Sequence, residues 1–300
     1  MSLMLANAPC SWGVLEFGLE GEVSPWPRVL DEMAEAGYVG TELGDWGFLP
    51  SDPVRLNEEL SRRGLSLVGG FVPVALSQPS ARECGLATAL RTAWLLASVG
   101  GPDALLVLAD DNGTVATRTR NAGRIRPGMS LTEPEWDIFA AQAMEIARQV
   151  RDRVGIRTVF HHHCGGYVET GWEIDTLLTR TDPTLLGLCL DTGHALYGGS
   201  DPLELLRLYG DRIWHVHLKD MSPTVAAKAQ KQGWDYFQAV AQGVFPELGT
   251  GAADLPALLA ELRARAYTGW LVVEQDVLPS MGSPLASARR NRAYLQGLGL

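Results

Sequence analysis

The chain has 300 residues, of which 46% are hydrophobic and 20% are charged, and this composition excludes an intrinsically disordered protein. Its 35 acidic and 25 basic residues give a formal net charge of −10 without a basic run, which disfavours nucleic-acid binding. No segment reaches the roughly 18 apolar residues of a membrane span, and the amino terminus lacks the pattern of a signal peptide. We therefore expect a cytoplasmic protein with no membrane or nucleic-acid partner.

Apolar runs alternate with segments of helical periodicity along the chain. The expected strands cover residues 4–10, 39–43, 65–72, 104–109, 157–163, 185–191, 213–218 and 270–275. The expected helices cover residues 26–36, 53–63, 82–99, 133–154, 172–179, 202–209, 255–265 and 284–298. Eight strand–helix units without a linker predict one α/β domain over residues 1–300, a (β/α)8 TIM barrel. A doubly wound sheet is the alternative, but the first strand lacks the glycine-rich turn typical of that fold.

Polar residues gather at the carboxyl ends of the predicted strands, where TIM barrels build their active sites. Asp191, His217 and Glu274 end three successive strands and should converge at the mouth of the barrel. Mixed nitrogen and oxygen ligands suit Mn²⁺, Co²⁺, Zn²⁺ or Fe²⁺ better than Ca²⁺, so this group predicts a metal site. Each residue alone could instead be a buried polar group satisfied by hydrogen bonds.

The fourth ligand is open between residues of one segment, 160–170. His161 and His163 share a strand face, and the glycines that follow could return Glu169 toward the mouth. We expect His161 as the ligand, with Glu169 as the alternative. The remaining polar groups at the strand ends would contact substrate or orient the ligands.

Two stretches, 110–131 and 221–251, are too long for tight turns, and both should lie at the mouth because each follows a strand. The first contains four arginines between 118 and 126, which either clamp an anionic substrate or belong to a solvated loop. The second contains Trp234, Tyr236 and Phe237, which either form a hydrophobic lid or pack on the rim. Trp12, after the first strand, is open to the same two interpretations.

A set of motifs occurs in order along nearly the whole chain: ANAPCSWGV, GYVGTELG, FHHHCGGYVET, LCLDTGH, HVHLKD, LGTGAADL and GWLVVEQD. Together they resemble the xylose-isomerase-like barrel superfamily of sugar isomerases and epimerases, and within it the inosose dehydratase branch. The resemblance implies one divalent metal held by Glu, Asp, His and Glu on strands 5 to 8. Asp191, His217 and Glu274 match the last three, whereas His161 stands where the first glutamate is expected.

The resemblance further implies a lyase of inositol catabolism that dehydrates scyllo-inosose (2-keto-myo-inositol) through an enediolate. Mn²⁺ or Co²⁺ is the expected metal, with Zn²⁺, Fe²⁺ or Mg²⁺ as alternatives, and a homodimer or homotetramer is the expected assembly. We expect Glu274 or His161 to act as the base, assisted by three further residues: Lys219, His194 and Glu169. The expected substrate contacts are Asn7, Trp12, Glu42, His163, His215, Trp234 and Phe237.

Three other functions are weighed against this one. A metal-dependent isomerase or epimerase of a keto sugar or hydroxy-keto acid could use the same site. A DNA-repair endonuclease shares the barrel, but it would need a basic groove that the net charge of −10 disfavours. A metal-free binding module would leave the polar residues satisfying one another.

Overall fold

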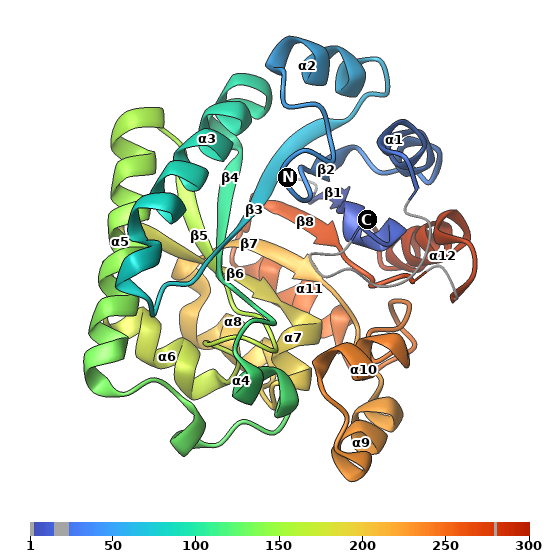
Figure 1. Cartoon of the computed structure of the whole chain (residues 1–300). Helices are drawn as coiled ribbons and strands as arrows, with labels where there is room; N and C mark the ends of the chain where they lie inside the picture. Colours follow the sequence, from blue (N-terminus) through green and yellow to red (C-terminus); the bar gives the residue numbers. More distant parts are fainter. Residues whose placement is uncertain (1–2, 15–23, 279–280) are drawn as a thin grey trace.

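The chain forms a closed barrel of eight parallel strands, β1 to β8, in sequence order (Figure 1). A computed structural model describes residues 3–14, 24–278 and 281–300. β1 pairs with β8 through four residue pairs from Met4↔Trp270 to Asn7↔Val273, and this pairing closes the barrel. The predicted TIM barrel is confirmed. The strands are β1 (Met4–Asn7), β2 (Gly40–Glu42), β3 (Ser66–Val74), β4 (Leu105–Asp110), β5 (Arg157–His161), β6 (Leu186–Asp191), β7 (Ile213–Leu218) and β8 (Trp270–Val273).

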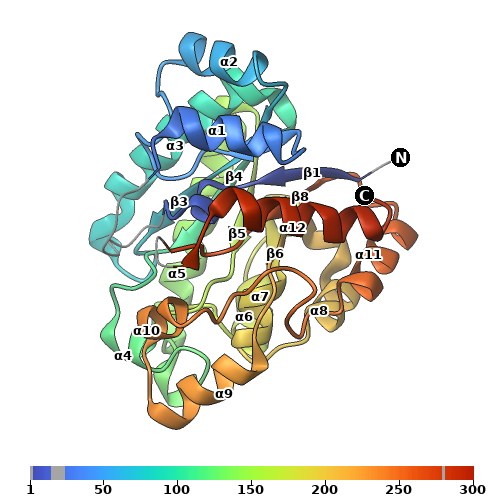
Figure 2. The same cartoon turned by 90° about the vertical axis from the view of Figure 1, so that its right-hand side faces the viewer.

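Helices surround the barrel and return the chain from each strand to the next (Figures 1 and 2). Many begin at an aspartate or serine that accepts a backbone N–H of the first turn, as Asp201 does from Leu203 and Asp254 from Ala257. They are α1 (Trp26–Glu35), α2 (Pro53–Ser61), α3 (Arg82–Gly100), α4 (Ala116–Arg120), α5 (Glu133–Val154), α6 (Gly171–Thr179), α7 (Thr192–Tyr197), α8 (Pro202–Tyr209), α9 (Pro223–Gln232), α10 (Tyr236–Ala241), α11 (Leu255–Ala264) and α12 (Pro284–Gly297). None of these helices within the described residues is long and apolar enough to cross a membrane.

Three strands end two or three residues earlier than the sequence predicts. β1 ends at Asn7 because Pro9 lacks the N–H that a ladder needs and begins a short 3-10 helix, Pro9–Trp12. β5 ends at His161, and the next ring, that of His162, accepts the backbone N–H of Asp191 at 3.2 Å. β8 ends at Val273, two residues before its expected end.

The two long segments after β4 and β7 contain short helices that the sequence analysis did not predict. The first holds α4, and the second holds α9 and α10, which extend from the barrel on the side of the strands' carboxyl ends (Figure 2). Ser222 accepts the N–H of Val225 and Asp235 accepts the N–H of Gln238. Both helices therefore begin at capping residues that were readable from the sequence.

The largest apolar core lies between the strands and the helices, and smaller clusters fill the barrel itself. One interior cluster joins Leu105, Val107, Val159 and Cys189, with the Trp214 ring packed against it. A Cβ at Gly187 would lie 2.4 Å from that ring, so only glycine leaves room for Trp214 there. The barrel is thus filled by apolar groups at one level, and its polar side chains collect above them, at the carboxyl ends of the strands.

Candidate active site

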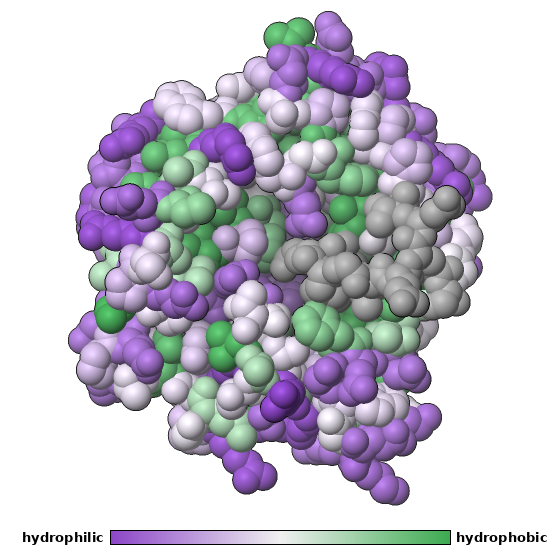
Figure 3. Space-filling view, viewed as in Figure 1, coloured by the Kyte–Doolittle hydropathy of each residue, from purple (hydrophilic) through white to green (hydrophobic). Residues whose placement is uncertain are grey.

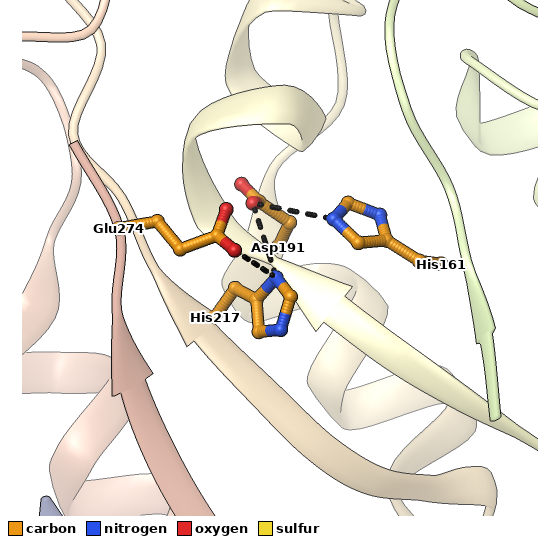
Figure 4. Close-up of side chains that lie close together, drawn as sticks. All are labelled: His161, Asp191, His217 and Glu274. Carbon is orange, nitrogen blue, oxygen red and sulfur yellow. Dashed lines mark ion pairs between the residues drawn. The ribbon is translucent and has the colours of Figure 1, made fainter. Parts of the chain in front are cut away.

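Four side chains at the carboxyl ends of β5, β6, β7 and β8 point toward one centre at the mouth of the barrel, and one of them, Glu274, directly follows β8 (Figure 4). His161, Asp191, His217 and Glu274 are buried, and one ligand atom from each lies within 4.8 Å of the others. Asp191 Oδ2 is 3.8 Å from both His161 Nε2 and His217 Nδ1, and His217 Nδ1 is 3.3 Å from Glu274 Oε1. The structure therefore brings together the four residues that the sequence nominated as metal ligands.

The hydrogen bonds of this cluster leave free the atoms that a metal needs. Asp191 Oδ1 accepts the N–H of His194 at the start of α7, whereas the buried Oδ2 has no hydrogen-bond partner. His161 Nδ1 lies 2.6 Å from the carbonyl oxygen of His162 and must donate to it, which leaves the Nε2 lone pair toward the cluster. Buried polar atoms without partners are costly, and a cation bound among them would satisfy them. The cluster can therefore hold a metal ion.

Burial and the neighbouring charges set the protonation of the two carboxylates. Burial, opposed by Lys219 and reinforced by the Glu274 carboxylate, raises the pKa of Asp191 to about 6. Burial also acts to raise the pKa of Glu274, but the charges of His217 and Lys219 outweigh it and lower that pKa well below its usual value. A cation at the centre would favour the ionised form of both groups.

A cavity with a volume of about 570 Å³, which includes space open to solvent, lies over the cluster. In the space-filling view, hydrophilic side chains lie in the middle of this face, which looks onto the carboxyl ends of the strands (Figure 3). Five predicted site residues line the cavity: Glu42, His161, His163, Lys219 and Glu274. The sequence analysis did not select Phe71, Tyr236 or Asp276 as substrate contacts, although they line it too.

Lys219 is the cation of this cavity. Its Nζ lies 3.1 Å from Glu274 Oε2 and 3.5 Å from Asp276 Oδ1, and its side chain is buried. Burial acts to lower the pKa of Lys219, but the carboxylates of Asp276, Glu274 and Asp191 outweigh it and raise that pKa well above its usual value. Lys219 is therefore a protonated group in direct contact with Glu274.

His163 and His194 stack beside the cavity, with ring centroids 3.8 Å apart. The Nδ1 of His163 donates to the carbonyl oxygen of Cys164 at 2.7 Å, which leaves Nε2 as an acceptor 3.4 Å from the hydroxyl of Tyr236. His194 packs against the ring of His163 and does not itself line the cavity. Tyr236 is the first residue of α10 and lies in the sequence between Trp234 and Phe237, the two residues of this segment that the sequence analysis named as substrate contacts.

Glu169 does not join the metal cluster. Its Oε1 accepts the N–H of Gly123 at 2.6 Å and its Oε2 accepts the N–H of Gly165 at 3.1 Å. The side chain is completely buried, and this burial raises the pKa of Glu169 to about 7. The structure thus places Glu169 between the loops that follow β4 and β5, and it gives the fourth position in the cluster to His161.

Several expected substrate contacts lie away from the cavity. Trp12 is buried in the core, and its Nε1 donates to Glu32 at 2.7 Å. Asn7 Oδ1 accepts the N–H of Ala8, and His215 lies beneath the cavity with its Nε2 on Glu42. Trp234 and Phe237 belong to the cluster of apolar residues around α9 and α10. A direct contact of these side chains with substrate has no support from the structure.

The arginine-rich segment does not form an anion clamp. The Arg118 guanidinium is completely buried, and its Nη1 and Nη2 donate to the two oxygens of Glu173, each at 2.9 Å. The Arg124 guanidinium donates to the carbonyl oxygens of Ala229 and Trp234. Both groups are already engaged within the protein, and no arginine lines the cavity among the residues that the structure describes.

A closed TIM barrel with carboxylate and histidine side chains at its mouth is also found in a known protein family. Residues 30–298 match the family described as xylose isomerase-like TIM barrel, and the chain belongs to that family. It is 35% identical to the inosose dehydratase of Geobacillus kaustophilus (strain HTA426), over 97% of this chain and 93% of the relative. It is 30% identical to the inosose dehydratase of Lacticaseibacillus casei, over 98% and 97% of the two chains. The resemblance inferred from the motifs is confirmed.

A solved structure shares the fold at lower sequence identity. The L-ribulose 3-epimerase structure superposes with a TM-score of 0.71 at 18% identity, covering 99% of this chain and 94% of the other. At this identity the likeness establishes the barrel alone.

Proposed function

We propose that this protein is a metal-dependent hydro-lyase that dehydrates scyllo-inosose, a neutral cyclic polyol ketone. The observation that carries the proposal is the 35% identity, over 97% of the chain, to a protein named inosose dehydratase. The cavity supports it, because histidine, tyrosine and carboxylate side chains suit the hydroxyl groups of a polyol. The lack of a lining arginine in the described chain suits a substrate without a carboxylate or phosphate group.

His161, Asp191, His217 and Glu274 would hold the metal ion. Two imidazoles and two carboxylates favour Mn²⁺ or Co²⁺, and Zn²⁺, Fe²⁺ or Mg²⁺ are the alternatives. A divalent cation bound there acts as a Lewis acid on the substrate ketone and makes the neighbouring C–H group more acidic.

Glu274 and Lys219 can carry the two proton transfers of the dehydration. Glu274 takes the proton from the carbon next to the ketone, and Lys219 gives a proton to the hydroxyl of the following carbon, which departs as water. The resulting enol rearranges to the diketone. Because Lys219 Nζ lies 3.1 Å from Glu274 Oε2, the proton gained by Glu274 can pass to Lys219 and restore both groups.

The position of Glu169 favours this lyase over an epimerase with two glutamate bases. Such an epimerase removes a proton from one face of the substrate and returns it from the other, so it needs two carboxylates at the metal. Here His161 holds the strand-5 position, and both oxygens of Glu169 are bound to the backbone of Gly123 and Gly165. Within the part of the chain that the structure describes, the cluster thus offers Glu274 as a glutamate base without a second glutamate at the metal position.

The test is turnover of scyllo-inosose by the purified protein with Mn²⁺ or Co²⁺, followed by mass spectrometry in H₂O and D₂O. We expect a product lighter by one water, and Glu274→Gln should abolish it. Glu261→Gln is the matched control, because that carboxylate pairs with Arg265 on the outer helix α11. Incorporation of deuterium next to the ketone without loss of water would instead establish the epimerase, and turnover confined to ketohexoses would contradict the proposed substrate.

A further inference from the structure

Glu42 contacts two histidines of β7, His215 and His217. It contacts the edge of the His217 ring that faces away from the metal cluster. Its Oε1 lies 2.7 Å from Nε2 of His215 and 3.0 Å from Nε2 of His217, and all three side chains are buried. One carboxylate oxygen of Glu42 lies within hydrogen-bond distance of both Nε2 atoms, and a carboxylate oxygen accepts hydrogen bonds. The Nε2 of each histidine therefore carries the hydrogen.

The hydrogen on Nε2 of His217 determines what its other nitrogen can do. A neutral imidazole with Nε2–H has its lone pair on Nδ1. That Nδ1 is buried without a hydrogen-bond partner and lies 3.3 Å from Glu274 Oε1 and 3.8 Å from Asp191 Oδ2. With a cation bound in the cluster, the neutral ring donates to Glu42 from one edge and offers its Nδ1 lone pair from the other.

The barrel places these three residues together through its strand geometry. His215 and His217 alternate on β7, so both rings point inward, with centroids 5.2 Å apart. The register between β2 and β3 shifts between Thr41 and Glu42, at the end of β2. A Cβ at Gly69 would lie 3.1 Å from Glu42 Oε1, so glycine on β3 leaves room for the carboxylate.

We propose that Glu42 is a positioning residue, which fixes the tautomer and orientation of His217 and so raises the metal affinity of the site. His215 shares the same oxygen and holds the carboxylate in place. Glu42 also lines the cavity, so the substrate contact expected of it from the sequence stays a prediction. The positioning role rests on the metal site proposed above. Metal-binding histidines generally donate their second nitrogen to such a partner, and losing the partner weakens binding.

The first test measures Mn²⁺ affinity by competition with a fluorescent chelator. Glu42→Gln should weaken Mn²⁺ binding by about 10- to 100-fold, because the neutral amide no longer enforces Nε2–H on His217. Asp45→Asn is the matched control, since Asp45 is a half-buried carboxylate of the same cavity. Its affinity should stay within about twofold of the wild type, because a partly exposed charge acts only through screened electrostatics. Equal Mn²⁺ affinity in the wild type and Glu42→Gln would overturn the proposal.

The second test reads the tautomer directly and needs no variant. Long-range ¹H–¹⁵N spectra of the ¹⁵N-histidine-labelled protein, as purified and loaded with diamagnetic Zn²⁺, should show Nε2–H on His215 and His217. A hydrogen on Nδ1 of His217 in the Zn²⁺-loaded protein, or an Nε2 of His217 without hydrogen in either sample, would overturn the proposal. A wild type that binds no Mn²⁺ would contradict the metal dependence proposed above, and the spectrum of the protein as purified would then decide the role of Glu42 by itself.

Discussion

Replacing Arg118 by methionine should destabilise the fold rather than alter substrate recognition. Arg118 makes two parallel hydrogen bonds to Glu173 and a third, from Nε, to the carbonyl oxygen of Gly166 at 2.7 Å. Breaking a completely buried ion pair from one side costs about 3–5 kcal/mol, because the remaining charge is left buried. Glu173 still accepts hydrogen bonds from Ser130 and from the backbone of Thr170, so we expect about 3 kcal/mol, at the lower end of that range.

Urea unfolding followed by circular dichroism measures this loss. Arg120→Met, an exposed change on the same helix α4, is the control and should change the free energy of unfolding by less than about 0.5 kcal/mol. Arg118→Lys should also destabilise the protein, because an ammonium cannot reproduce the paired geometry of the guanidinium. The reasoning is refuted if Arg118→Met unfolds within about 1 kcal/mol of the wild type and instead raises KM, since that would identify an anion clamp.

Three further outcomes are expected. Asp191→Asn should lose stoichiometric Mn²⁺, seen by metal analysis after gel filtration, because Oδ2 is the unpartnered oxygen of the cluster; retained metal would contradict its role. Burial raises the pKa of Glu169 from 4.5 to about 7, so the folded state binds an extra proton between these values and stability falls as pH rises through them, by up to about 1.4 kcal/mol per pH unit. Urea titrations should show this slope in the wild type and not in Glu169→Gln; equal slopes would exclude it. Trp12→Phe should cost about 1–2 kcal/mol through the lost hydrogen bond to Glu32, without changing KM; a raised KM would restore Trp12 as a substrate contact.

The sequence predicted best what strand geometry alone determines. Asp191, His217 and Glu274 lie at or directly after the ends of parallel strands. Closure of the barrel brings such positions together independently of the conformation of the loops. The ends of β1 and β5 were less predictable, because Pro9 and the ring of His162 redirect backbone hydrogen bonds locally.

The position of a loop side chain depends on partners that are distant in sequence. The sequence allowed Glu169 to be a metal ligand, but in the structure its oxygens accept the N–H groups of Gly123 and Gly165. The sequence also allowed Arg118 to bind an anionic substrate, but in the structure it pairs with Glu173, 55 residues away. Nothing in the periodicity of the chain marks such pairings. Glu42 is intermediate, because its strand end predicted a place near the mouth but not its bonds to two histidines.

The pairing of Arg118 with Glu173 has a consequence for how the barrel can be assembled or divided. Arg118 follows the fourth strand and Glu173 follows the fifth, so the pair spans the midpoint of the eight-unit repeat. A half-barrel fragment ending at Val154 would bury or expose a guanidinium without its carboxylate, and its complement would carry Glu173 without that cation. Neither half contains both members of the buried pair, so an exchange of half-barrels between related proteins would preserve the pair only if both halves supply matching residues.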